Sequence, residues 1–266
     1  MSEIERRETS VLAKAFGLRQ REVISLTGAG GKTTLMFLLA RELFVSGKRV
    51  VTTTTTKILE PRPGETASLI VDESEEDLKQ FVEKHLDQYK HLTIATERLG
   101  SDKLKGVSSE LVDELWGSKR VDYIIVEADG AAGRPVKAPR EKEPVIPSNT
   151  TVLVAILGVD GIGMEINDEN VFQAGRVAEL TGIPMGEKLT EEGAAVLLTH
   201  PEGILKGIPF SSKGIVFLNK VDVPHGMKVA IETAQKIIGK GHPQIERVVL
   251  GQLRKEPPWV EVIFPS

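Results

Sequence analysis

The 266-residue sequence predicts a doubly wound α/β fold, with a mainly parallel sheet and helices on both faces. An apolar strand at 22–27 runs through a glycine-rich turn into a helix at 32–46 that ends at Gly47, and a second strand follows at 50–54. A strand, a helix and a strand in this order form a right-handed crossover between parallel strands. Short apolar runs then alternate with helical segments along the rest of the chain, as a doubly wound sheet requires.

The individual elements follow from periodicity and turn residues. A short helix is expected at 8–16, and the acidic segment 75–90 is expected to be an amphipathic helix because apolar residues recur in it at helical spacing. The later elements are strand 92–96, helix 108–117, strand 123–126, strand 151–157, helices near 170–181 and 190–198, strand 214–218, helix 226–239 and strand 246–250. Proline and glycine make 60–66 and 129–150 loops. We expect a single domain over 1–266, and a compact subdomain around 159–212 is an open alternative.

Composition excludes several classes of function. A net charge of −4 argues against a nucleic-acid partner, because affinity for the phosphate backbone comes from clustered Lys and Arg. The chain has no cysteine, which excludes disulfides, zinc-thiolate sites and iron–sulfur clusters. The five histidines form no HxH or HExxH pattern. The charged N-terminal residues do not resemble a signal peptide and no apolar run is long enough to span a membrane, so we expect a cytoplasmic protein without a membrane partner.

The segment after the first strand, TGAGGKTT, is typical of a phosphate-binding loop. Glycines allow positive φ and let backbone N–H groups surround an anion, and the helix start adds further N–H donors. Lys32 would supply a cation to the β- and γ-phosphates, and Thr33 would ligate Mg²⁺. Leu26 stands where the common pattern has its first glycine, so the loop is closer to the TGxxGKTT form of Mur-type ligases. The expected nucleotide contacts are Gly28, Ala29, Gly30, Gly31, Lys32, Thr33 and Thr34.

Two acids follow the apolar strand 123–126. Glu127 and Asp129 stand at its carboxyl end, where phosphate-loop proteins place an acid that binds Mg²⁺ or polarises water. Alternation along an extended strand puts both on one side. We expect Lys32, Glu127 and Asp129 to be catalytic and Thr33 and Asp129 to be metal ligands. A pair of acids in an ordinary strand-ending turn is the alternative.

A second motif, NKVD, ends the strand at 214–218 with Asn219, Lys220 and Asp222. In GTP-binding proteins the aspartate of such a motif accepts hydrogen bonds from guanine, while the asparagine and lysine brace the base pocket. The motif favours GTP over ATP, although ATP-using proteins carry similar residues. The segment 160–163, DGIG, also matches the short DxxG pattern of GTPases, which arises easily by chance.

Two further groups could bind a substrate or an anion. Thr55, Thr56 and Lys57 close the second strand with hydroxyls and a cation, although threonine is also a good strand former. The 129–150 loop carries Arg134 and Lys137, together with Arg140 and Lys142. A basic cluster on an acidic protein suggests an anionic ligand beside the nucleotide. A solvated surface loop is the alternative reading.

Taken together, TGAGGKTT, TTTTTKI, VEADGAAGRPVKAP, EPVIP and LNKVD resemble the YqeC-like family across nearly the whole chain. The family is described as accessory proteins of selenium-dependent molybdenum hydroxylases. The resemblance implies a fold like that of P-loop NTPases and a role in making or inserting a selenium-containing molybdenum cofactor, with a hydroxylase apoprotein or its pterin cofactor as partner. Phe172 and Gln173 stand where this family is expected to have a His-Arg pair, so no catalytic role is expected there.

The sequence is compatible with three functions. The first is binding and hydrolysis of Mg-GTP or Mg-ATP during cofactor maturation. The second is a small-molecule kinase or ligase that uses the same loop, with the substrate held by Lys57, Arg134 and Lys137. The third is a non-catalytic assembly factor whose nucleotide gates an interface, with the 129–150 loop as the docking element.

Overall fold

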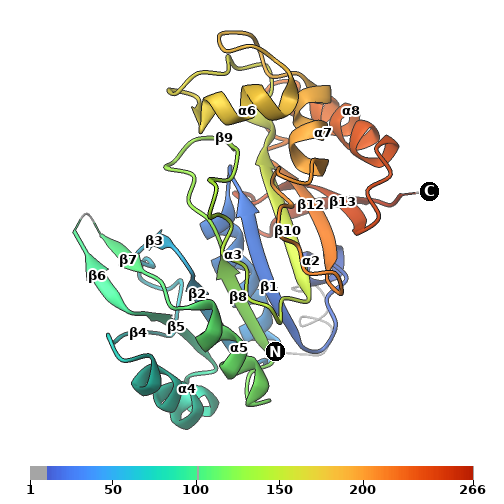
Figure 1. Ribbon diagram of the computed structural model, residues 1–266. Coiled ribbons are helices and arrows are strands. Elements are labelled where there is room, and N and C mark those ends of the chain that lie inside the picture. Colours follow the sequence, from blue (N-terminus) through green and yellow to red (C-terminus); the bar gives the residue numbers. More distant parts are fainter. Residues whose placement is uncertain (1–10, 101, 266) are drawn as a thin grey trace.

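The computed structural model describes residues 11–100 and 102–265, and it has the doubly wound α/β fold that the sequence predicts (Figure 1). Within these residues one nine-stranded sheet has the order β14 (Trp259–Ile263), β13 (Ile245–Gln252), β12 (Lys213–Asn219), β10 (Val152–Gly158), β1 (Glu22–Gly28), β8 (Tyr123–Glu127), β2 (Val50–Thr54), β5 (His91–Ala95) and β4 (Ser68–Val71). All neighbours are parallel except β13 and β14, which pair antiparallel at one edge. The strand that leads into the glycine loop, β1, therefore lies inside the sheet between β8 and β10.

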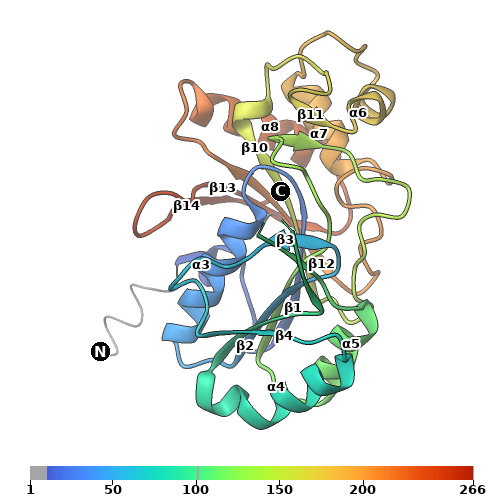
Figure 2. The ribbon, with the colours of Figure 1, turned by 90° about the vertical axis from the view of Figure 1, so that its left-hand side faces the viewer.

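Helices cover both faces of this sheet. They are α2 (Val11–Ala15), α3 (Lys32–Val45), α4 (Glu75–Tyr89), α5 (Ser109–Gly117), α6 (Ala174–Thr181), α7 (Glu191–Thr199) and α8 (Gly226–Gly239), with a 3-10 turn, η1 (Val159–Gly161). Figure 2 shows α3 and α5 on opposite sides of β1 and β2. Serine side chains cap two of the helices: Ser74 accepts from the backbone of α4, and Ser108 from that of α5.

The core divides according to strand alternation. Ile24, Ile125 and Val154 pack with α2 and α3 on one face, whereas Val23 and Ile124, their neighbours in the chain, pack with α4 and α5 on the other. On the same face as α4 and α5, a third cluster joins β10, β12 and β13 to α6, α7 and α8. The segment 159–212 shares this third cluster with the sheet. The single domain over 1–266, with a subdomain around 159–212 as the alternative, stays a prediction.

Two small sheets were not expected from the sequence. A three-stranded antiparallel sheet has the order β3 (Lys57–Leu59), β7 (Lys103–Lys105) and β6 (Glu97–Leu99), and it projects to the left in Figure 1. The pair β9 (Val136–Lys137) and β11 (Val171–Phe172) forms a short parallel ladder. These strands are too short to show a hydrophobic period, and their pairing is set by tertiary contacts.

Three segments differ from the expectation. The helix expected near 170–181 begins only at Ala174, because Val171 and Phe172 pair with β9 and Gln173 adopts a left-handed conformation with φ of 61°. The 129–150 stretch is not a purely solvated loop, since Val136 and Ala138 are buried in the core. The leading helix covers Val11–Ala15, and residues 8–10 of the expected helix lie outside the described residues.

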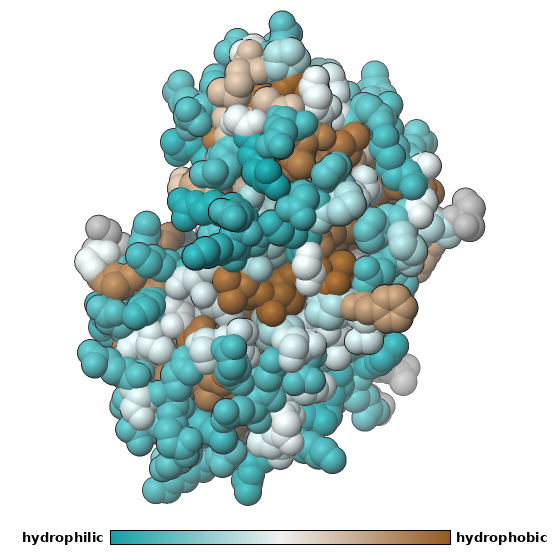
Figure 3. Space-filling view, in the orientation of Figure 1, coloured by the Kyte–Doolittle hydropathy of each residue, from teal (hydrophilic) through white to brown (hydrophobic). Residues whose placement is uncertain are grey.

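The surface in the orientation of Figure 1 is hydrophilic over most of its area, with brown apolar patches between the hydrophilic parts, among them one at mid-height (Figure 3). Among the described residues, none of the helices has the length and apolar character needed to cross a bilayer.

Candidate functional site

The glycine loop after β1 has a backbone that only glycine fits. Gly28, Gly30 and Gly31 have φ angles of 92°, 90° and 144°. A Cβ on Gly28 or Gly30 would lie 2.1 Å or 2.4 Å from backbone atoms of β10, and a Cβ on Gly31 would lie 2.4 Å from the Asn219 side chain. The loop thus lies close to the backbone of β10 and to the Asn219 side chain at the end of β12, and only glycine leaves room for this approach.

Helix α3 begins directly after the loop. Its N-cap is Gly31, and no side chain caps it within the part of the chain that the structure describes. The first N–H groups of a helix have no intrahelical acceptor, and the helix dipole makes this end positive. The N–H of Ala29 is used differently, since it donates to the Ile156 carbonyl at 2.9 Å. The first turn, with Lys32, Thr33 and the exposed Thr34, is the part of the loop open to an anion.

Lys32 is buried at the centre of the site. Its Nζ donates to the Gly28 carbonyl at 2.5 Å and lies 3.1 Å from Asp129 Oδ1 and 3.7 Å from Glu127 Oε1. Burial acts to lower the pKa of Lys32, but attraction to Asp129 and Glu127 outweighs it and the net pKa is raised. The ammonium is therefore held charged between two acids.

Glu127 is the acid that lies beside Thr33. The Thr33 hydroxyl donates to Glu127 Oε2 at 2.7 Å. Burial raises the pKa of Glu127 and Asp129 adds to the rise, against the opposing effects of Lys32 and the Thr33 hydrogen bond. Since both acids contact Lys32, strand alternation brings them to one side as expected. Of the two, Glu127 is adjacent to the expected metal-binding hydroxyl.

Asp129 lies deeper and has a second cation. Its Oδ2 accepts from the Gly28 N–H at 3.0 Å and lies 2.9 Å from Lys137 Nζ. The Lys137 side chain is 0% exposed, and its Nζ also donates to the Gly130 carbonyl at 2.6 Å and to Glu143 Oε2 at 3.1 Å. Lys137 thus joins Asp129 to Glu143, and its position differs from that of an exposed anion-binding lysine.

The NKVD segment approaches the loop from the neighbouring strand end. Asn219 Nδ2 donates to the Gly30 carbonyl at 2.8 Å, and Asn219 Oδ1 accepts from the backbone of Leu253 at 3.4 Å. Lys220, with φ of 69°, pairs with Asp160 Oδ2 at 2.6 Å, so the DGIG and NKVD segments meet. Asp222 is exposed beyond the strand. Asn219 therefore braces the glycine loop, while Asp222 is exposed to solvent.

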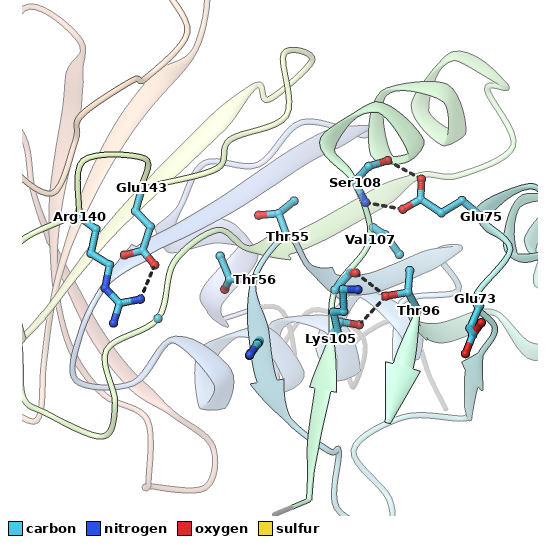
Figure 4. A pocket seen from close by; sticks show the side chains of 13 residues that line it. Thr55, Thr56, Glu73, Glu75, Thr96, Lys105, Val107, Ser108, Arg140 and Glu143 are labelled. Atoms are coloured by element: carbon cyan, nitrogen blue, oxygen red, sulfur yellow. Dashed lines mark hydrogen bonds and ion pairs between the residues drawn. The ribbon is translucent and has the colours of Figure 1, made fainter. Parts of the chain in front are cut away.

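The threonine run leads into a cavity of about 640 Å³ beside this site. Thr55, Thr56 and Lys57 line it, together with Arg140 and Glu143 from the 129–150 stretch (Figure 4). The full lining also includes Glu73, Glu75, Thr96, Lys105, Gly106, Val107, Ser108 and Gly130. Earlier threonines of the run are structural: Thr53, for example, is buried and donates to the Ile94 carbonyl at 2.8 Å.

Arg134 does not line this cavity. Its guanidinium donates to the backbone carbonyls of Asp168 and Ala132 at 3.1 Å and 3.4 Å. Arg140 instead packs over the Phe172 ring, with Cζ 4.7 Å from the ring centroid, and the same ring lies 5.5 Å from Lys137 Nζ. Phe172, at the position where a His-Arg pair was expected, therefore supports the cations of the 129–150 stretch.

The oxygen donors at the site fit Mg²⁺ only in part. Thr33 and Glu127 offer a hydroxyl and a carboxylate, the kind of ligand Mg²⁺ prefers. Within residues 11–100 and 102–265, no group of three or more acids, histidines or cysteines is arranged to hold a metal alone. Magnesium bound through one or two carboxylates usually completes its shell with phosphate and water, so the donor set suits an ion that arrives with a nucleotide.

Sequence reasoning missed three parts of the site: Glu143, Lys105 and the buried role of Lys137. A lysine is rarely fully buried unless it is paired, and its partners come from separate segments. A signal for Glu143 existed in the sequence, since an acid six residues after Lys137 in a proline-rich stretch could return to it. Lys105 belongs to a three-residue strand and carried no such signal.

The fold and site define a doubly wound α/β protein with a glycine loop, a buried lysine and an acidic strand end brought together at one edge of its parallel sheet. A sequence model described as YqeC protein matches residues 24–175. A protein of Escherichia coli (strain K12) named uncharacterized protein YqeC is 30% identical over 251 residues, which cover 94% of this chain and 95% of that protein. The chain therefore belongs to the YqeC family.

A solved structure is similar only at a low level. It is the signal recognition particle 54 kDa protein from Aeropyrum pernix K1 in complex with GDP, with a TM-score of 0.38 and 18% identity. The match covers 99% of this chain and 50% of that chain. The similarity is too low to carry an argument about function.

Proposed function

We propose that this protein binds a Mg-nucleotide at the glycine loop and hydrolyses it. The observation that carries the proposal is the position of Lys32, whose ammonium lies at the start of α3 between Gly28, Glu127 and Asp129. A triphosphate would replace the two carboxylates as the partner of this cation. The freed acids would then face the nucleotide.

The side chains divide the work as follows. Lys32 and the N–H groups of the loop would neutralise phosphate charge. Thr33 and Glu127 are adjacent and would hold Mg²⁺, which supplies electrostatic stabilisation of the phosphoryl group when bound. Asp129 was the expected metal ligand, but its contacts with Gly28 and Lys137 favour a role in fixing the loop, with a metal contact as its second role.

GTP is the favoured nucleotide in this proposal. Asn219 contacts the glycine loop and Lys220 pairs with Asp160, which supports a base pocket built at the end of β12. Asp222 is exposed there and could accept two hydrogen bonds from guanine. Such bonds to a charged acceptor contribute about 1.5–3 kcal/mol, enough for about tenfold selectivity over adenine.

The cellular role is proposed from the family resemblance. We place the protein in the cytoplasm, assisting the maturation or insertion of the cofactor of a selenium-dependent molybdenum hydroxylase. The hydroxylase apoprotein or its pterin cofactor would be the partner. Without cysteine, this chain would have to hold selenium or molybdenum through oxygen, nitrogen or the pterin.

A small-molecule phosphotransferase is a second candidate, favoured by the cavity of about 640 Å³ beside the glycine loop. Glu143 and Gly130 line that cavity and both contact Lys137, which contacts Asp129. A phosphoryl acceptor bound there would lie next to the nucleotide site. Turnover that stays near zero until a low-molecular-weight acceptor is added would favour this candidate. Slow hydrolysis with nucleotide-dependent binding of an apoprotein would favour a gated assembly factor.

Calorimetry of Mg-GTP and Mg-ATP tests the main proposal. We expect Lys32→Ala to abolish measurable binding of both, because the cation at the phosphates is lost. Asp222→Ala should weaken GTP by about tenfold and leave ATP unchanged. Asp168→Ala, an exposed acid distant in sequence from the NKVD segment, is the matched control. Equal affinities that Asp222→Ala leaves unchanged would reject the guanine assignment, and no binding of either nucleotide would reject the proposal.

A further inference from the structure

The cavity beside the glycine loop has basic side chains on two sides. Lys57 and Lys105 come from the small sheet, and Arg140 comes from the 129–150 stretch. In Figure 4, Arg140 and Glu143 lie across the cavity from Lys105 and Thr96, with Thr55 and Thr56 between them. A volume of about 640 Å³ is in the range of small-molecule sites, about 300–1,000 Å³. The size and the polar lining fit a small charged ligand.

Lys57 and Lys105 are directly opposite one another in the β3–β7 ladder. Like charges in this position destabilise an antiparallel pair. Lys105 forms an ion pair at 3.7 Å with Glu97, which stands opposite it in the β6–β7 ladder, whereas Lys57 forms no ion pair with any of the described residues. Of the two facing lysines at the cavity wall, Lys57 is therefore the one whose charge no described carboxylate neutralises.

The other cations of the neighbourhood are already neutralised. Lys137 contacts Asp129 and Glu143, and Arg140 lies 3.9 Å from Glu143 and stacks on Phe172. Glu75, on the far wall, accepts hydrogen bonds from the backbone N–H and the hydroxyl of Ser108, each at 2.5 Å. Among the cations that line the cavity, Lys57 is therefore the one left without a carboxylate partner in the described residues, and Lys105 lies directly opposite it.

We propose that the cavity is a binding site for a small phosphorylated molecule, with its phosphate held between Lys57 and Lys105. A phosphate ester carries up to two negative charges and three acceptor oxygens, and lysine binds phosphate as a point charge. The hydroxyls of Thr56 and Thr96 and the carboxylate of Glu73, for which the described residues provide no ion pair, line the remaining space. They suit a ligand whose other end carries hydroxyl or amino groups.

The contacts of Lys137 give this site a path to the nucleotide site. Glu143 lines the cavity and is joined through Lys137 to Asp129, which contacts Lys32. As the substrate of a phosphotransferase, the ligand rests on the proposed nucleotide function. As a bound molecule it does not, because the lysines of the small sheet belong to the cavity and not to the glycine loop.

An NMR titration of the full-length protein with inorganic phosphate tests the proposal at constant ionic strength. We expect saturable amide shifts at Thr56, Lys57, Lys105 and Gly106. The double variant Lys57→Ala and Lys105→Ala should weaken the phosphate affinity read from Thr56 and Gly106 by about tenfold or more, because two charged partners are lost. Lys103→Ala removes a lysine from the same strand that does not line the cavity, and it should change the affinity by less than about twofold.

Four results would overturn the proposal. They are no saturable shift at the cavity amides, an equal effect of Lys103→Ala, no effect of the double variant, and tighter binding of citrate than of phosphate, which would indicate a carboxylate ligand. The amides of Gly30, Gly31 and Thr33 report separately on phosphate at the glycine loop. Failure of that second set alone would count against the nucleotide proposal and leave the cavity site standing.

Discussion

The glycine-loop site and the adjacent cavity differ in the burial and the pairing of their lysines. At the loop, Lys32 and Lys137 are buried, and each contacts carboxylates that are buried or nearly so. At the cavity, Lys57 and Lys105 are exposed and face one another. The buried charges must be paired because the interior cannot solvate them, whereas water can solvate the exposed pair.

The difference has a functional consequence. A site whose charges already satisfy one another holds its shape without a ligand, and a ligand must exchange with an existing partner. A site with excess charge on its surface gains a partner when the ligand binds. We therefore expect variants at the loop to change stability strongly, and variants at the small sheet to change mainly ligand affinity.

The largest effect is expected at Lys137. Lys137→Met keeps most of the side-chain volume but leaves Asp129 and Glu143 buried without their cation. Breaking a buried pair in this way costs about 3–5 kcal/mol. Urea denaturation should show a loss of this size in the free energy of unfolding. Lys142→Met, at an exposed position of the same loop, should change it by less than about 0.5 kcal/mol. Similar stabilities for the two variants would contradict a paired, buried lysine.

His91 shows what burial does to a titratable group without a charged partner. It is 3% exposed, and its Nε2 lies 3.1 Å from the Thr52 hydroxyl. Burial lowers the pKa of His91 to about 4 from an ordinary value of 6.5. Between these values the unfolded chain binds a proton that the folded protein does not. Stability is therefore lost as the pH falls from 6.5 towards 4, by about 3 kcal/mol in all.

The test compares the pH dependence of unfolding for wild type and His91→Gln. The variant should lose less stability than wild type between pH 6.5 and pH 4, because glutamine does not titrate there. Subtracting one curve from the other removes the contributions of the groups that both proteins share. His200→Gln is the control, as His200 is partly exposed at the C-cap of α7. Parallel curves for wild type and His91→Gln would contradict a neutral buried histidine.

Alanine variants of two glycines distinguish the cost of close backbone approach at the glycine loop from the cost of a left-handed backbone alone. Gly30 and Gly64 have nearly the same φ, 90° and 89°, but a Cβ would meet β10 backbone at 2.4 Å in Gly30 and nothing within 4 Å in Gly64. Gly64→Ala should cost only the left-handed strain, about 1–2 kcal/mol. Gly30→Ala should cost about 1–3 kcal/mol more, because the loop must move away from β10. Equal losses in thermal unfolding would show that the loop can move freely.

The sequence was sufficient for seven of the nine strands of the main sheet, because these are apolar runs joined by helices with clear periods. It did not predict the two edge strands, β4 and β14. The sequence also predicts that Lys32 lies close to Glu127 and Asp129. A glycine loop and an acidic strand end belong to neighbouring parallel strands, whose carboxyl ends lie at one edge, and alternation turns both acids to the same side.

The sequence was not sufficient for the cavity. Three residues such as Lys57–Leu59 carry no period, so the small sheet and the facing of Lys57 with Lys105 depend on pairing that spans some fifty residues. The burial of Lys137 is similar, because a lysine in a proline-rich stretch is typical of surface. Only the contact of that stretch with β11 and the strand ends buries it.

The smallest effect is expected at Lys57. Lys57→Thr removes the like charge opposite Lys105 and introduces a good strand former, so the free energy of unfolding should rise by about 0.5 kcal/mol in phosphate-free, low-salt buffer. Salt should reduce the gain because it screens the repulsion that the variant removes. Lys103→Thr has Leu59 and Leu99 opposite and should show no salt-dependent gain. A salt-independent effect at Lys57 would mean that the two lysines do not repel one another, and the excess charge of the cavity would then lie elsewhere.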